Sequence, residues 1–66
     1  MNISEQKQIL TEAAEYIGKA IREISYIPDD NLDFSLLNND ISKILTRVNE
    51  SIIELDRIEQ QDSPHD

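Results

Sequence analysis

The chain has 66 residues, of which 14 are acidic and 6 basic, and its formal net charge is -8. This negative excess disfavours direct binding to nucleic acids and to anionic membranes, both of which attract Lys and Arg. The chain contains no Cys, no run of about 18 apolar residues and no basic segment ahead of an apolar one, which predicts no disulfide, no thiolate zinc site, no membrane span and no signal peptide. We therefore expect a cytoplasmic protein.

The first predicted helix covers about residues 4–26. Asn2 followed by Glu5 has the spacing of a capping box at its start. Apolar residues recur at seven-residue intervals, with a second row three positions further on, and together they form a stripe wide enough for a helical bundle. The stripe consists of Ile3, Leu10, Ile17 and Ile24, then Ala13, Ala20 and Ile27, widened by Ala14 and Ile21.

Gly18 lies in the middle of this helix, among several alanines. Glycine costs about 1 kcal/mol relative to alanine inside a helix. Its presence has two interpretations: another helix approaches closely here, or the position is exposed and tolerant. The sequence leaves both open.

Residues 27–33 are predicted to form a turn. Pro28 cannot continue a helix, because it lacks an N–H and its ring clashes with the preceding turn of backbone. The polar residues that follow favour turns and helix N-caps, since their short side chains accept bonds from nearby backbone N–H groups. These are Asp29, Asp30, Asn31 and Asp33.

The same turn carries a pattern that resembles a calcium-binding EF-hand loop, with an Asp in its last position as in dockerins. The candidate ligands are Asp29, Asn31, Asp33, Ser35 and Asp40. Phe34 stands where the loop requires a glycine, because that position takes a positive φ. An ordinary capped turn is the alternative interpretation, and we expect no metal or other cofactor.

The second predicted helix covers about residues 34–60. Ser51 is the one polar residue in its apolar rows, and its hydroxyl can bond to the carbonyl four residues back. The rows again recur every seven residues and form a wide stripe. They consist of Phe34, Ile41, Val48 and Leu55, then Leu37, Ile44, Ser51 and Ile58, with Leu45 and Ile52 alongside.

Two long helices with a short connection predict an antiparallel hairpin over residues 1–61, followed by a flexible acidic tail at 62–66. One hairpin cannot cover two wide stripes, so we expect two copies to pair as a dimeric four-helix bundle. A trimer, or a hairpin docked on a different protein, is the alternative. The predicted bundle interface comprises Leu10, Ala13, Ile17, Ala20, Ile21, Ile24, Phe34, Leu37, Ile41, Ile44, Leu45, Val48, Ile52, Leu55 and Ile58.

Three apolar residues, Ile9, Tyr16 and Ile53, lie off the main rows. We interpret Tyr16 and Ile53 as a possible surface for a partner protein, with additional dimer core as the alternative. Contiguous apolar surface of this kind marks interfaces.

No catalytic set is recognisable in the sequence. The only histidine, His65, lies one residue from the end of the chain. No Cys nucleophile exists and no base can be assigned to a Ser or Thr, whereas an active site needs such groups positioned together in a pocket. We expect a protein that is not an enzyme.

The negative charge is concentrated at two places in the chain. Residues 28–35 carry a net charge of -3 and residues 54–66 a net charge of -4, whereas residues 1–27 carry only -1. In a hairpin these acidic segments lie at opposite ends, with mixed charges between them, whereas a DNA mimic spaces its carboxylates along one face. An acidic decoy that imitates DNA and occupies a nucleic-acid-binding protein is the alternative to a protein–protein interaction module.

Two short segments resemble parts of known regulators. Ile17-Gly18-Lys19-Ala20-Ile21-Arg22-Glu23-Ile24, followed by Asp30-Asn31-Leu32, resembles the small all-helical biofilm and acid-resistance regulators of the AriR type. Glu54-Leu55-Asp56 resembles the end of the Ser-Gln-Glu-Leu-Asp motif of small hairpin regulators of sporulation phosphorelays, without the Ser-Gln pair. Neither resemblance assigns a role to a residue, but both imply that hairpins of this kind serve as regulators. Because the apolar stripes exceed what one hairpin can bury and no catalytic set is present, we expect a protein–protein interaction module, a small regulator, inhibitor or chaperone-like adaptor that acts through a helical face.

Overall fold

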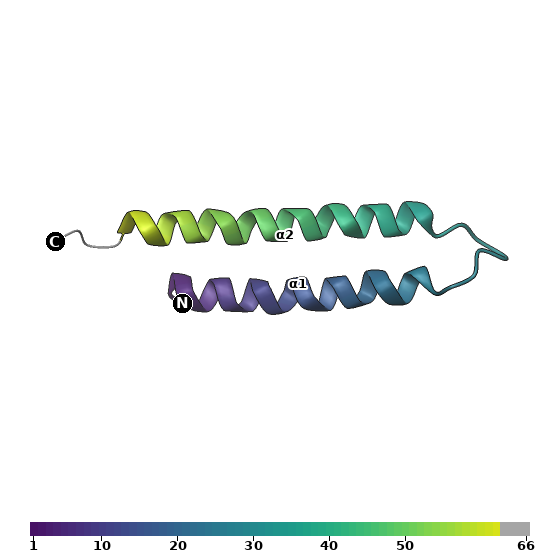
Figure 1. The fold of residues 1–66 in the computed structure, drawn as a ribbon, viewed down its shortest axis with the longest axis horizontal. Helices are drawn as coiled ribbons and strands as arrows, with labels where there is room; N and C mark the ends of the chain where they lie inside the picture. The colour runs from purple at the N-terminus through teal and green to yellow at the C-terminus, as the bar shows by residue number, and fades with distance from the viewer. Residues whose placement is uncertain (63–66) are drawn as a thin grey trace.

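The computed structural model describes residues 1–62 and contains two helices, α1 (Ile3–Ser25) and α2 (Ser35–Asp62). Figure 1 shows them side by side and running in opposite directions, with the connection at one end and the N-terminus at the other. The two helices pack against each other, and residues 1–62 contain no strand. The predicted all-α antiparallel hairpin is confirmed.

Helix α1 has a defined bond pattern at each end. The Asn2 side chain accepts a 2.8 Å bond from the Glu5 N–H, and the Glu5 carboxylate accepts a 3.5 Å bond from the Asn2 N–H, which completes the predicted capping box. At the other end, the N–H groups of Tyr26 and Ile27 donate to carbonyls three residues back. Pro28 follows directly, and no helix continues through it.

Two aspartates of the turn position the start of α2. Asp33 Oδ1 accepts a 2.9 Å bond from the N–H of Ser35, and Asp29 Oδ1 accepts a 3.4 Å bond from the N–H of Phe34. These bonds satisfy N–H groups at the helix start that have no partner within the helix. The bonds from the Ser35 backbone and hydroxyl to Asp33 lower the pKa of that carboxyl below its ordinary value.

The observed helix bounds differ by one or two residues from the predicted 4–26 and 34–60. Asp62, predicted to begin the flexible tail, is the last residue of α2. The remainder of the predicted tail, residues 63–66 with His65, lies outside the described residues.

The seam between the two helices is formed by half-buried side chains spaced alternately four and three residues apart. It comprises Ile3, Lys7, Leu10, Ala14, Ile17, Ile21 and Ile24 from α1, and Phe34, Asn38, Ile41, Leu45, Val48, Ile52, Leu55 and Glu59 from α2. On each helix the seam uses the row four positions after the first apolar row. The row three positions after it, which includes Leu37 and Ile44, takes no part in the seam.

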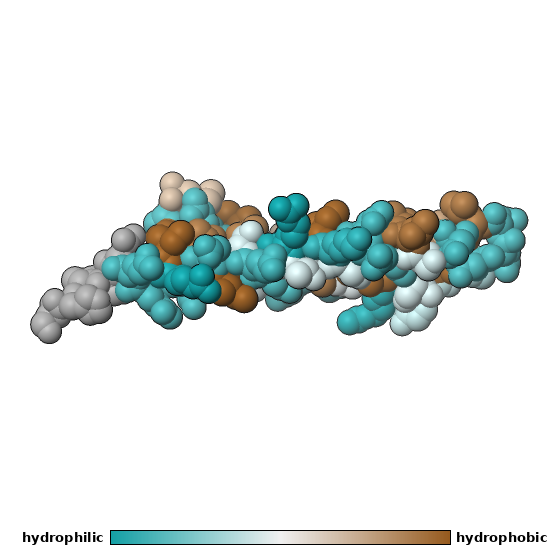
Figure 2. Space-filling model, turned by 90° about the horizontal axis from the view of Figure 1, so that it is seen from above, coloured by the Kyte–Doolittle hydropathy of each residue, from teal (hydrophilic) through white to brown (hydrophobic). Residues whose placement is uncertain are grey.

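The two broad sides of the hairpin have different compositions. On one side lie the rows three positions after the first apolar row, and we call them, with Ile9, the apolar face: Ile9, Ala13, Ala20, Ile27, Leu37, Ile44, Ser51 and Ile58. On the opposite side lie the rows one position after it, which we call the polar face: Ser4, Thr11, Gly18, Ser25, Ser35, Ser42, Asn49 and Asp56. Figure 2 looks onto α2 and shows polar side chains over most of that surface, with apolar ones gathered mainly along one long edge.

Candidate functional site

The apolar face is the candidate functional site, because its large side chains are accessible to solvent along the whole hairpin. Ile27 is 44% exposed, Leu37 45%, Ile44 52% and Ile58 43%, while Ile9 is 52% exposed at its flank. No side chain in residues 1–61 is buried, so the hairpin has no core of its own beyond the half-buried seam. Exposed apolar side chains gathered on one face are typical of interaction sites.

The two helices contribute jointly to this face. At the open end of the hairpin a shallow and largely apolar groove lies between them. Its lining consists of Met1, which precedes α1, then Gln6, Ile9 and Leu10 from α1 and Ser51, Glu54 and Leu55 from α2. In both α1 and α2, the row three positions after the first apolar row therefore lies on the same side of the molecule.

The groove also gives the register of the face, because both helices repeat every seven residues. Gln6 and Ile9 lie beside Ser51 and Glu54. One repeat closer to the turn, the equivalent positions are Ala13 and Tyr16 beside Ile44 and Arg47. A further repeat brings Ala20 and Glu23 beside Leu37 and Asp40. At the second and third of these levels, α1 contributes the alanine and α2 the larger apolar side chain.

The predicted interface residues divide into two groups in the structure. Leu37, Ile44 and Ile58 lie exposed on the apolar face, next to the half-buried Ala13 and Ala20. The other ten lie in the seam between the helices: Leu10, Ile17, Ile21, Ile24, Phe34, Ile41, Leu45, Val48, Ile52 and Leu55. Ser51 bonds to the Arg47 carbonyl at 3.0 Å, as its position in the sequence suggested.

Tyr16 and Ile53, the predicted partner surface, lie apart from each other. Tyr16 is 67% exposed at the α1 flank of the apolar face, with Lys19 Nζ 5.7 Å from its ring centroid, a cation–π distance. Ile53 is 58% exposed on the outer side of α2, beside Glu50, Glu54 and Arg57. They form no common surface in one copy of the hairpin.

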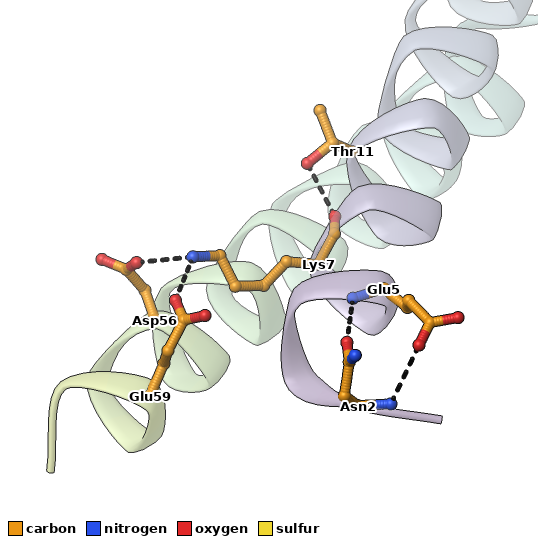
Figure 3. A network of polar contacts seen from close by, with 6 residues as sticks. All are labelled: Asn2, Glu5, Lys7, Thr11, Asp56 and Glu59. Carbon is orange, nitrogen blue, oxygen red and sulfur yellow. Dashed lines mark hydrogen bonds and ion pairs between the residues drawn. The ribbon is translucent and has the colours of Figure 1, made fainter. Parts of the chain in front are cut away.

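The polar contacts at the open end connect the two helices on the side of the polar face. Figure 3 shows Lys7 Nζ between Asp56 and Glu59, at 2.9 Å and 2.7 Å from their carboxylate oxygens. The hydrogen bonds to Glu59 and Asp56 raise the pKa of Lys7. Sequence reasoning missed this contact, although Lys7 continues the row of Ala14 and Ile21 at the same seven-residue interval.

Asn38 is a second polar residue in the seam that sequence reasoning missed. Its Oδ1 atom is buried and has no hydrogen-bond partner in the part of the chain that the structure describes. A buried acceptor without a partner costs about 1–3 kcal/mol. Its position in the sequence could have indicated this place, because Asn38 continues the row of Leu45 and Ile52 at seven-residue intervals.

The geometry of the turn gives no support to the calcium-loop interpretation. Helix α2 begins at Ser35, so Ser35 and Asp40 belong to the helix, while Asp29 and Asp33 accept backbone hydrogen bonds. Phe34 has no positive φ, which the glycine position of such a loop requires. Within residues 1–62, no three carboxylate, imidazole or thiol side chains gather as metal ligands.

Neither helix, as far as it is described, has the length and apolarity needed to cross a membrane. Comparisons with protein-family models, with curated proteins and with solved structures find no match to this chain. The two short resemblances in the sequence are therefore not accompanied by a matching family.

Proposed function

We propose that the protein is a non-catalytic protein–protein interaction module that self-associates into a dimeric four-helix bundle. In this form it serves as a small regulator, inhibitor or adaptor that presents a helical surface to a larger partner. The observation that carries the proposal is the apolar face, which runs the length of the hairpin while no side chain in residues 1–61 is buried.

The amount of exposed surface supports self-association. The chain exposes 5434 Å². A compact monomer of 7.6 kDa exposes about 4,300 Å², so the chain as a whole exposes about 1,100 Å² more. Each partner in a standard-sized interface contributes about 800 Å². The surplus is thus large enough to supply one such interface.

The free energy of folding also favours self-association. Ordering one residue costs about 1–2 kcal/mol of backbone entropy, which must be offset mainly by burial of apolar surface. Fully burying an Ile or Leu side chain gains about 1.5–3 kcal/mol, and the seam leaves Ile27, Leu37, Ile44 and Ile58 about half exposed. A short chain without a disulfide is stabilised most directly by covering that face with another protein surface.

The acidic-decoy alternative has less support from the geometry. A decoy needs carboxylates aligned along one face, but Asp56 and Glu59 at the open end are both paired with Lys7. Asp29 and Asp33 bind the start of α2 at the opposite end of the hairpin. These four carboxylates therefore serve the hairpin itself, two at each end.

Sedimentation equilibrium at micromolar concentration tests self-association, and we expect a mass of twice 7.6 kDa. Affinity capture from host extract at low and high salt then tests whether the protein binds a larger partner through a helical surface. We expect a captured protein to be retained at high salt, because apolar contacts are not screened. A folded monomer in the centrifuge contradicts the bundle, and capture of nucleic-acid-binding proteins that is lost at high salt favours the decoy.

A further inference from the structure

We infer that a second copy of the chain covers the apolar face in one specific arrangement, with α1 of each copy lying on α2 of the other and both turns at the same end. This inference rests on the proposed self-association and adds the face and the orientation. A two-fold axis can stack two hairpins face to face in one other way, which we call the competing solution. In it α1 lies on α1, α2 lies on α2, and the turns lie at opposite ends.

Side-chain size separates the two solutions. On the apolar face α1 presents Ala13 and Ala20, whereas α2 presents Leu37 and Ile44 at the same levels. When α1 lies on α2 of the second copy, each alanine meets a large side chain, and the four helices keep even spacing. In the competing solution alanine meets alanine and Ile44 meets Ile44, so one pair of helices is close and the other is forced apart. Interiors pack to uniform density, which favours the first solution.

The charges that flank the face do not separate them. The flank of α2 carries Asp40, Arg47 and Glu54 at seven-residue intervals. In the competing solution the two α2 helices run antiparallel, so when Ile44 meets Ile44, Arg47 comes opposite Asp40 of the second copy. These side chains are exposed, and exposed ion pairs contribute little to stability.

In the inferred arrangement the turn aspartates of both copies come to the same end, but they are exposed and screened by salt beyond about 8 Å. The choice between the two arrangements therefore rests on side-chain size.

The test is an intermolecular distance measured between identical labels. Leu32 lies in the turn, is 63% exposed and belongs to neither face, so Leu32→Cys carries a spin label without disturbing the interface. With both turns at one end, we expect a label distance below about 30 Å, because neighbouring helices pack 8–10 Å apart. A distance beyond about 40 Å, the length of α2, overturns the inference while the dimer stands.

Crosslinking provides a second, independent readout, since the chain has no cysteine of its own. Under mild oxidation, an equimolar mixture of Ala13→Cys and Ile44→Cys chains should give a covalent dimer that contains one of each. Ile44→Cys alone should remain uncrosslinked, because the two Ile44 positions lie on diagonal helices. Efficient crosslinking of Ile44→Cys with itself overturns the inferred arrangement. A sample that sediments as a monomer and shows no intermolecular distance overturns both this inference and the proposed self-association.

Discussion

The two broad faces of this hairpin are built from the same two helices and the same seven-residue repeat, yet they differ in composition. One face presents Ile27, Leu37, Ile44 and Ile58, and the other presents mainly Ser, Thr, Gly and Asn. The seam between the helices uses the first apolar row and the row four positions after it, and it leaves the large side chains of the row three positions after the first exposed. If the chain self-associates as proposed, its folding and its self-association draw on separate rows of the same repeat.

The largest difference between the faces should appear when the same charge is placed on the apolar face and away from it. Ile44 and Ile53 are the same residue type on α2, 52% and 58% exposed. Ile44→Glu should weaken self-association by about 100-fold or more, roughly 3 kcal/mol, because a carboxylate is taken out of water without a partner. Ile53→Glu is the matched control, and sedimentation should show it as dimeric as the unaltered chain. Equal effects of the two substitutions would mean that the faces are not distinct.

A second prediction separates the seam from both faces. Asn38→Leu should raise the free energy of unfolding by about 1–2 kcal/mol, because it removes a buried acceptor that has no partner and adds apolar contact in the seam. Urea unfolding provides the measurement. Asn49→Leu on the polar face makes the same chemical change where nothing is buried, and it should give much the smaller gain. Destabilisation by Asn38→Leu would show that the amide makes a bond in the assembled protein.

A third prediction concerns the polar face directly. A methyl group added at Gly18 meets no atom within 4 Å, so close approach of α2 does not explain this glycine. Gly18→Ala should therefore stabilise the protein by about 0.5–1 kcal/mol through helix propensity, as measured by thermal unfolding. The dimer should be unaffected, because the second copy packs on the opposite face. Weaker self-association in this variant would place the contact on the polar face.

The smallest expected effect is on pH dependence, and it involves neither face. The lowered pKa of Asp33 means that its charged form stabilises the fold at pH values above the ordinary 3.8 and that this contribution is lost as pH falls through the lower folded value. Asp33→Asn keeps an acceptor for the Ser35 N–H but removes the titrating group. The stability difference between the two proteins should be present above pH 3.8 and shrink below it, as followed by urea unfolding. A difference that is constant with pH would show that the charge of Asp33 contributes nothing.

The parts of the fold that could be predicted were those set by local chemistry. Pro28 and the aspartates after it indicate the turn, Asn2 with Glu5 indicates the start of α1, and the repeat gives two helices. Which row forms the seam could not be predicted, because apolar residues stand three and four positions after the first row alike. Lys7, Asn38 and Glu59 show that the chosen row even includes polar residues. The residues of the apolar face could therefore be identified only once the residues of the seam were known.

The claim that a second copy completes the hairpin is tested most directly by unfolding the unaltered chain at different concentrations. When folding and dimerisation are coupled, mass action stabilises the folded state as concentration rises. Between about 1 and 100 μM, we expect the midpoint of thermal unfolding to increase by about 5–10 °C. A cooperative transition whose midpoint stays constant over that range would show that the apolar face remains uncovered by a second copy.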